Sequence, residues 1–209
     1  MELVKRELVT LFPSNLFTGK VSDITLCDRV EKKLREMQQA GQGSGEERVF
    51  VTTDDIDKLP DFKELADLVM KEADNILNFY RVKRESHYIS NMWGNITHPN
   101  HRHHMHIHPN CLLSGIFYVK APAKCGPTMF VDPRPGARMI QPSYLETNLQ
   151  NSSVYVVAAE KGRMLIWPSY LPHAVENGQA DVSEDRIVVA FNIMIRGTID
   201  VRTARLELN

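Results

Sequence analysis

The chain has 209 residues, of which 43% are hydrophobic, so it is long enough for one domain with a sizeable core. Its 25 basic and 26 acidic residues give a formal net charge of -1, which argues against binding nucleic acid or an anionic membrane through bulk charge. No apolar run approaches the roughly 20 residues of a membrane helix, the N-terminus lacks the apolar stretch of a signal peptide, and the three widely spaced cysteines indicate reduced thiols, so we expect a cytoplasmic protein.

Two amphipathic helices are expected in the first part of the chain, residues 1–85. Asp23 can cap a helix over residues 23–39, whose apolar side chains fall on one side. A second helix is expected over residues 61–80, because its apolar residues recur every three or four positions. The Gly- and Ser-rich segment 38–47 between them is predicted to be a surface loop.

After residue 86 the pattern changes to short apolar runs separated by turn residues. Strands are expected at residues 87–93, 105–108, 113–119, 128–131, 154–158, 163–167 and 186–195. Around seven short strands in succession are typical of a sandwich or a jelly roll. The prediction is a mainly β (α+β) protein of one domain, residues 1–209, in which residues 1–85 form an N-terminal strand and helix buttress outside a jelly-roll core, residues 86–197.

Six of the eight histidines lie between His98 and His108. Residues i and i+2 of a strand face the same side, so we expect the side chains of His106 and His108 to point to one face of the strand. The alternation puts His104 on that face too. Two imidazoles at this spacing can bind one metal ion, since imidazole suits Fe, Zn, Cu and Ni. The competing interpretation is a solvated polar loop that is rich in histidine.

His173 is the one histidine after this cluster. It follows a predicted strand and a turn bracketed by Pro168 and Pro172, which restrict the backbone around it. Taken alone, it would more often be an ordinary polar side chain. As a partner of the doublet it is the best candidate for a third ligand, so the sequence predicts one metal ion bound by His106, His108 and His173.

The last predicted strand has two different faces. One is strongly apolar and consists of Ile187, Val189, Phe191, Ile193 and Ile195; the other consists of Arg186, Val188, Ala190 and Asn192. The second face either meets solvent or lines a polar cavity, and the pattern leaves both open. In a cavity, Arg186 would suit a carboxylate, because its planar guanidinium can bond to both oxygens.

A His-x-His, a distal histidine and an arginine on the next strand resemble the order found in Fe(II)- and 2-oxoglutarate-dependent dioxygenases. The resemblance runs through about residues 86–197 and is strongest to the group of such oxygenases from marine bacteria and their phages. Its carrying segments are Trp93-Gly94-Asn95, His106-Ile107-His108-Pro109-Asn110, Leu113-Ser114-Gly115-Ile116-Phe117-Tyr118-Val119, Phe130-Val131-Asp132-Pro133-Arg134, Ile166-Trp167-Pro168-Ser169, His173 and residues 186–192. Each segment alone is a weak signal, and together they are fairly specific.

The resemblance implies a double-stranded β-helix, a jelly roll whose open end holds Fe(II), with 2-oxoglutarate as cosubstrate. It also implies that His106, His108 and His173 are the metal ligands and the catalytic centre. The usual triad has two histidines and one carboxylate. Here His108 takes the place of the carboxylate, which leaves Zn, Ni and Cu as alternative occupants.

The resemblance further implies that Arg186 binds the distal carboxylate of 2-oxoglutarate and that Tyr118 directs its hydroxyl at this cosubstrate. Asn95 and Asn192 are weaker candidates for contact with cosubstrate or substrate. Trp93 is interpreted as a core residue. The superfamily often has Ser or Thr two residues after the arginine, where this chain has Val188, so Arg186 has one fewer polar neighbour.

The leading hypothesis is an oxygenase that converts 2-oxoglutarate to succinate and hydroxylates a C–H bond of a small-molecule or peptide substrate. One alternative is a three-histidine, cupin-like dioxygenase that does not use 2-oxoglutarate, in which Arg186 would bind a carboxylate of the substrate. Another is a non-catalytic, metal-binding jelly roll. No nucleic-acid or membrane partner is expected, and a homodimer is left open.

Overall fold

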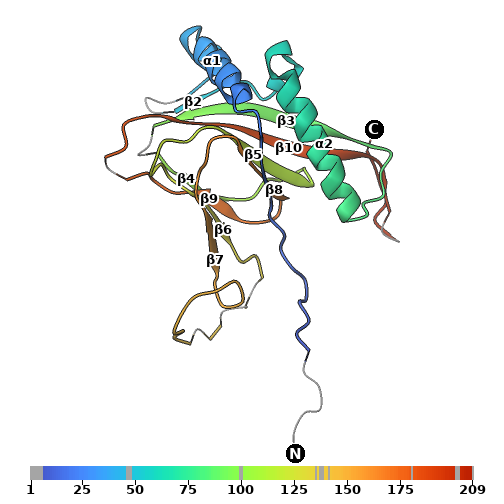
Figure 1. Cartoon of the computed structure of the whole chain (residues 1–209). Coiled ribbons are helices and arrows are strands. Elements are labelled where there is room, and N and C mark those ends of the chain that lie inside the picture. The colour runs from blue at the N-terminus through green and yellow to red at the C-terminus, as the bar shows by residue number, and fades with distance from the viewer. Residues whose placement is uncertain are drawn as a thin grey trace, which may run out of the picture.

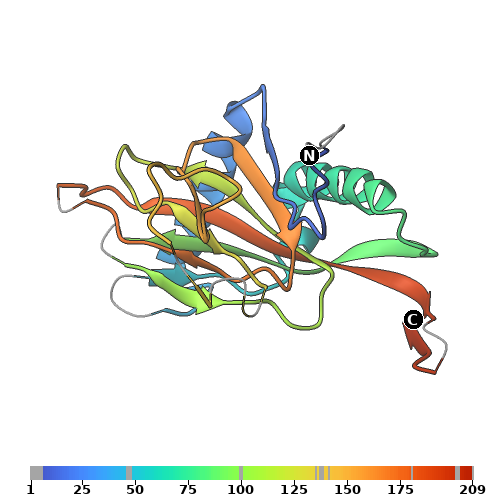
Figure 2. The ribbon, with the colours of Figure 1, turned by 90° about the horizontal axis from the view of Figure 1, so that it is seen from below.

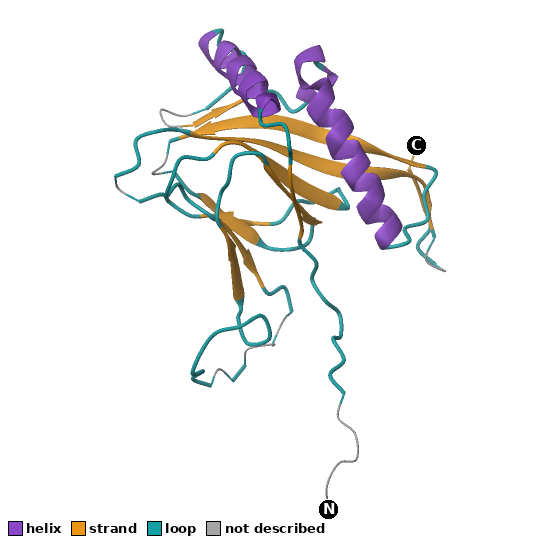
Figure 3. Ribbon diagram, viewed as in Figure 1, coloured by secondary structure: helices purple, strands orange, loops and turns teal. Residues whose placement is uncertain are grey.

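The computed structural model describes residues 7–45, 49–98, 101–134, 136, 139–140, 142–179, 181–200 and 203–208. Within these residues, two α-helices lie side by side over one face of a large antiparallel sheet, and a smaller sheet lies on its other side (Figures 1 and 3). This arrangement is the predicted mainly β jelly roll with helices packed outside. No helix in the described part of the chain is long and apolar enough to cross a membrane.

The larger sheet has the order β1-β8-β5-β10-β3-β2, with β11 beside β10, and the smaller sheet has the order β4-β9-β6-β7. In chain order, the two α-helices and the strands of both sheets are β1 (Phe17–Lys20), α1 (Thr25–Gln39), β2 (Val49–Val51), α2 (Lys63–Phe79), β3 (Ser86–Thr97), β4 (His103–His106), β5 (Leu113–Lys120), β6 (Thr128–Val131), β7 (Val154–Val157), β8 (Arg163–Pro168), β9 (His173–Val175), β10 (Arg186–Ile199) and β11 (Leu206–Leu208). Strands β3 and β10 run side by side along the larger sheet (Figure 2).

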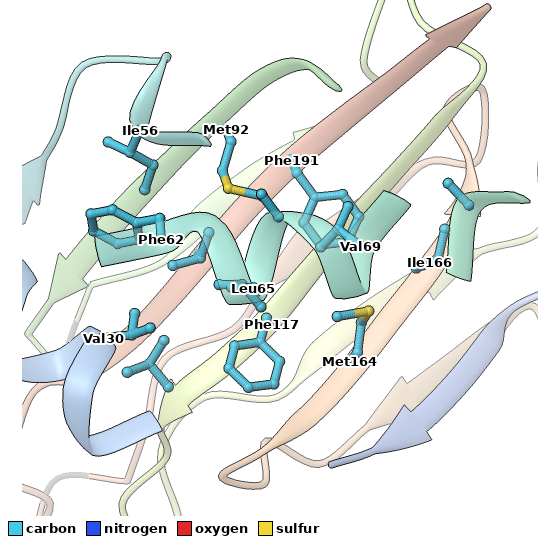
Figure 4. Packing of buried hydrophobic residues seen from close by; sticks show 14 of the residues in the cluster. Val30, Ile56, Phe62, Leu65, Val69, Met92, Phe117, Met164, Ile166 and Phe191 are labelled. Carbon is cyan, nitrogen blue, oxygen red and sulfur yellow. The ribbon is translucent and has the colours of Figure 1, made fainter. Parts of the chain in front are cut away.

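The helices cover the larger sheet because each has one apolar side. The buried residues of α1 and α2 are Leu26, Cys27, Val30, Leu34, Met37, Leu65, Ala66, Val69, Ala73, Ile76 and Leu77. They pack against side chains of the sheet such as Met92, Phe117 and Phe191 (Figure 4). Full burial of a side chain of this size contributes about 1.5–3 kcal/mol, so the helices and the sheet stabilise each other.

Strand β10 separates this core from the interior of the jelly roll. Its apolar face, from Ile187 to Ile195, belongs to the core under the helices. Arg186, Val188 and Ala190 on the other face line a cavity between the two sheets. The question that the sequence left open is thereby answered: the second face meets a cavity.

The largest differences from the predicted elements are in the short strands. The sequence did not predict β1, β2, β9 or β11, and it ended the strand that is β3 four residues too early. Helix α1 begins at Thr25, whose amide donates a hydrogen bond to Asp23 Oδ1 at 2.9 Å. Residues 46–47 of the predicted loop lie outside the described residues, as do residues 1–6 of the predicted buttress. The division between buttress and core stays a prediction.

Candidate metal centre

Three histidines meet between the two sheets. His106 is the last residue of β4, His173 is the first residue of β9, and His108 lies in the turn that follows β4. Each offers a ring nitrogen, and these atoms lie within 4.8 Å of one another. His106 and His173 are direct partners in the register of β4 and β9, with ring centroids 4.3 Å apart. The structure therefore brings the three predicted ligands together; that they bind a metal stays a prediction.

His108 is positioned by a turn, whereas the sequence placed it with His106 on one strand. Strand β4 ends at His106, and its register with β9 shifts between His103 and His106. Because of this irregularity His103 lines the cavity, although the predicted parity favoured His104. The predicted reason for the doublet is wrong, yet the turn still brings Nε2 of His108 within 3.2 Å of Nε2 of His106.

The Nδ1 atoms of all three rings face oxygen atoms that can only accept a hydrogen bond. The pairs are His106 Nδ1 with His104 O at 2.7 Å, His108 Nδ1 with Asn192 Oδ1 at 2.7 Å, and His173 Nδ1 with Leu171 O at 3.0 Å. Each Nδ1 must therefore carry the hydrogen, which leaves a lone pair on each Nε2. Metal-bound histidines are typically held by hydrogen bonds of this kind.

The geometry of the Nε2 atoms fits one metal ion. Two neutral imidazoles that both carry hydrogen on Nδ1 cannot donate to each other through Nε2, so the 3.2 Å contact between His106 and His108 joins two lone pairs. A shared cation would remove this repulsion. Two nitrogens about 2.1 Å from one ion, at right angles, lie about 3 Å apart. Imidazole nitrogen is a suitable ligand for Fe(II) and other first-row transition metals.

Burial favours the neutral imidazole of His108 and His173, the form that metal binding requires. It is the main cause that lowers the pKa of His173 to about 4, and it also lowers the pKa of His108. The pKa of His103 is lowered to about 4 as well, by burial first and then by the positive charge of Arg186. These rings therefore keep their lone pairs at neutral pH.

Arg186 brings a buried positive charge to the same cavity. The residue is 4% exposed, and its Nη1 donates a hydrogen bond to the carbonyl oxygen of Gly126 at 3.2 Å. Among the residues that the structure describes, no carboxylate forms an ion pair with it. Burial lowers the pKa of Arg186, but a guanidinium stays charged in proteins. A buried cation without a partner is costly, so the site suits an anion.

Two further polar atoms are buried without a hydrogen-bond partner in the described structure: Thr97 Oγ1 and Trp167 Nε1. Trp167 lines the cavity. Thr97 is the register partner of Arg186 across β3 and β10, and it shares a strand face with Asn95, which lines the cavity. Unsatisfied buried donors are rare in native proteins. Together with the guanidinium, they are candidate donors to a bound carboxylate.

The other predicted cosubstrate contacts occupy different positions. Asn95 lines the cavity, whereas Tyr118 and Asn192 are not among the residues described as lining it. Tyr118 is fully buried, burial raises the pKa of its hydroxyl, and this hydroxyl forms a 2.7 Å hydrogen bond with Thr128 Oγ1 in the cavity wall. Asn192 lies behind His108. Direct contact of these three residues with cosubstrate stays a prediction.

Trp93 is not the core residue that the sequence interpretation favoured. It is half-buried, lines the cavity and lies nearly parallel to the ring of His108, with centroids 6.0 Å apart and planes at 24°. The sequence interpretation placed residues 101–104 at the rim of the site, and His103 lines the cavity; Thr128, Trp167 and Val175 were not predicted there, nor was Thr97, which lies on the same strand face as Asn95. The alternation Trp93-x-Asn95-x-Thr97 could have revealed Thr97, because these residues face one side of β3.

Comparisons with known proteins agree with this geometry. Residues 91–192 match the model of a family described as "Putative 2OG-Fe(II) oxygenase", a segment that contains the three histidines and Arg186. No curated protein matches the chain in sequence.

Solved structures share the fold across most of both chains. A prolyl-4-hydroxylase from Pseudomonas putida is 11% identical over 88% of this chain and 94% of its own, with a TM-score of 0.64. HygX from Streptomyces hygroscopicus, solved with nickel and 2-oxoglutarate, is 14% identical over 91% and 88%, with a TM-score of 0.59. A prolyl hydroxylase from Trichoplax adhaerens is 12% identical over 86% and 83%, with a TM-score of 0.60. At these identities the likeness shows the fold, the two-sheet jelly roll of 2-oxoglutarate oxygenases. The family match, which covers 102 of the 209 residues, and this fold make the chain similar to the Fe(II)- and 2-oxoglutarate-dependent oxygenases, enzymes that use Fe(II) and 2-oxoglutarate.

Proposed function

We propose that the chain binds one Fe(II) ion through Nε2 of His106, His108 and His173 and works as a 2-oxoglutarate-dependent oxygenase. The observation that carries the proposal is that all three Nδ1 atoms have acceptors, which leaves a lone pair on each Nε2, and that one ring nitrogen from each histidine lies within 4.8 Å of the others. When bound, Fe(II), with O₂ as oxidant and 2-oxoglutarate as the source of two electrons, would supply the chemistry that hydroxylates a C–H bond of the substrate and releases succinate and CO₂. The sequence segments that carry the resemblance also favour the group of these oxygenases found in marine bacteria and their phages.

Arg186 is the proposed partner of the distal carboxylate of 2-oxoglutarate. Its guanidinium is buried and has no carboxylate partner among the described residues, and it can bond to both carboxylate oxygens. Thr97 Oγ1, on the register partner of Arg186, and Trp167 Nε1, on a residue of the cavity wall, are further candidate donors. Asn95 is the proposed amide contact, because its side chain is at the cavity wall. Tyr118 would act on the cosubstrate through Thr128, to which it is hydrogen-bonded.

The walls of the cavity are suited to keeping water away from the reaction. Trp93, Trp167, Ile116, Val175 and Val188 supply apolar surface around the histidines. Exclusion of water strengthens the electrostatic interactions inside a site and prevents side reactions. These residues therefore support the proposed chemistry without taking part in it.

The substrate class proposed is a small molecule or a peptide. Two proteins with this fold have been solved with such molecules: the Trichoplax prolyl hydroxylase with a peptide fragment, and HygX with hygromycin B. The near-zero net charge of the chain argues against nucleic acid as substrate. A homodimer stays open in this proposal.

The test is anaerobic titration of the Fe(II)-loaded protein with 2-oxoglutarate, followed by exposure to air. We expect the visible charge-transfer band of a 2-oxoglutarate chelate and then formation of succinate. Metal-dependent oxidation of a substrate with neither the band nor succinate would favour the cupin-like alternative. A bound metal without any oxidation would favour the non-catalytic jelly roll.

A further inference from the structure

His108 differs from the other two histidines in how its ring is held. His106 and His173 lie on strands, and their Nδ1 atoms face backbone carbonyl oxygens, which cannot turn into donors. His108 lies in a turn, and its Nδ1 faces the side-chain amide of Asn192 at 2.7 Å. An amide has an oxygen end and an NH₂ end, so this partner can accept or donate depending on its orientation.

The backbone of the turn is anchored at two points. The amide of His108 donates to the carbonyl oxygen of Ser169 at 3.1 Å, and the amide of Ser169 donates to the carbonyl oxygen of Leu112 at 3.0 Å. Asn110 adopts a left-handed backbone conformation, φ 61°, which asparagine tolerates well. These contacts place the Cα atom of His108 but do not choose which ring nitrogen carries the hydrogen.

A chain of buried side-chain hydrogen bonds is coupled to that choice through Asn192, whose Oδ1 faces both His108 Nδ1 and the Ser114 hydroxyl. The Cys111 thiol donates to Ser169 Oγ at 3.1 Å, Ser169 Oγ lies 2.8 Å from Ser114 Oγ, and the Ser114 hydroxyl donates to Asn192 Oδ1 at 2.9 Å. A hydroxyl has one hydrogen to donate. Because Ser114 uses its hydrogen on Asn192, Ser169 must donate to Ser114. Every hydrogen in the chain therefore points toward Asn192 Oδ1.

The alternative orientation of Asn192 would disable His108 as a ligand. With its NH₂ group toward the ring, Asn192 would donate to Nδ1, and the hydrogen of the neutral imidazole would move to Nε2. The lone pair that faces His106 would then be lost. The Ser114 hydroxyl and Asn192 are buried, at 0% and 8% exposure, and Ser114 donates to Asn192 only when Oδ1 faces it; in the alternative orientation Ser114 would accept from the NH₂ group and donate to Ser169 Oγ, so the serine hydroxyls turn together with the amide.

We propose that Ser114 and Asn192, supported by Ser169 and Cys111, are positioning residues that hold His108 in the tautomer with hydrogen on Nδ1. The proposal rests on the proposed metal site, since it explains how a histidine can replace a carboxylate there. A carboxylate has no tautomer to set, whereas an imidazole needs an acceptor of fixed orientation behind it.

The test measures the tautomer of each histidine by ¹⁵N NMR in the metal-free protein. In wild type, we expect hydrogen on Nδ1 of His106, His108 and His173. In Asn192→Leu, which removes the acceptor at similar volume, His108 alone should lose that preference. The other two rings are internal references. Asn91→Leu is the matched control, because Asn91 lies opposite Asn192 on β3 and its amide donates to Asp54 at 2.8 Å, away from the histidines.

A milder variant and a rescue separate positioning from packing. Ser114→Ala should produce a mixture of His108 tautomers, because the amide of Asn192 is then free to turn. In the Asn192→Asp background the same Ser114→Ala change should have no effect, since a carboxylate accepts at both oxygens. The affinity for Co(II) should fall about ten- to a hundredfold in Asn192→Leu and should be retained in Asn192→Asp. A packing role predicts the reverse, with leucine tolerated and a buried charge harmful.

Hydrogen on Nε2 of His108 in wild type, or an unchanged His108 tautomer in both Asn192→Leu and Ser114→Ala, would overturn the inference. The tautomers are read without metal or 2-oxoglutarate, so this failure is distinct from failure of the proposed function. If the tautomers behave as expected but no 2-oxoglutarate chelate forms, the positioning role stands and the oxygenase proposal fails.

Discussion

Replacing Arg186 by alanine should weaken binding of 2-oxoglutarate with little effect on metal affinity. Arg186 is 4% exposed, and its one hydrogen bond in the described structure goes to a neutral carbonyl oxygen, that of Gly126. A bound carboxylate would therefore add a charge-assisted interaction that nothing else in the site replaces. Such an interaction contributes about 1.5–3 kcal/mol, which corresponds to roughly ten- to a hundredfold or more in Kd.

The assay is the anaerobic 2-oxoglutarate titration of the Fe(II)-loaded protein, read at the charge-transfer band. Arg186→Lys should restore part of the affinity, because a point charge cannot reproduce the planar pair of hydrogen bonds. Arg196→Ala is the control: Arg196 lies on the same strand, but it is exposed and sits 4.4 Å over the ring of Tyr88. An unchanged midpoint in Arg186→Ala, with the band still present, would refute this placement of the carboxylate.

Three further predictions test other parts of the structure. Trp167→Phe keeps the aromatic ring but removes the unpartnered Nε1 donor, so 2-oxoglutarate should bind about tenfold more weakly while Co(II) affinity, measured by competition, stays the same. Phe191→Ala empties a fully buried position between the larger sheet and the helices and should lower the free energy of unfolding by about 3–5 kcal/mol; a change below 1 kcal/mol in urea denaturation would contradict the packing described. The pKa of His173 is lowered to about 4 in the folded protein from an ordinary value of 6.5, so below pH 6.5 the unfolded chain binds more protons at this residue, and the metal-free protein should lose stability as pH falls toward 4. His173→Gln should reduce this loss, and identical pH profiles of urea denaturation for the two proteins would contradict it.

Much of the fold could be predicted because its signals are local. The helices show apolar residues at every third or fourth position, and β10 alternates between an apolar face and a face with Arg186. The prediction that His106, His108 and His173 come together was confirmed by their positions, although the reason given for the doublet was wrong. The turn after β4 and the shift in register between β4 and β9 depend on pairing partners far along the chain, which local periodicity does not reveal.

The remaining features depend on tertiary structure. Strand β9 has three residues, too few for an alternating pattern, and it exists because it pairs with β4 and β6. Strand β8 is buried along most of its length, so no alternation marked Trp167 as a cavity residue. The position of Asn192 behind His108 joins residues 84 apart in sequence. The polar face of β10 suggested a cavity. The pattern could not show that Asn192, on this face, would contact the side chain of His108 and not line the cavity.

The most direct test of the central claim is metal content, measured by elemental analysis of protein purified without an affinity tag. The account predicts about one first-row transition metal ion per chain in wild type, bound through three neutral imidazoles. It predicts little or no metal in the His106→Ala, His173→Ala double variant, provided that circular dichroism shows the variant to be folded. Full metal occupancy in that folded variant would contradict the assignment of the site.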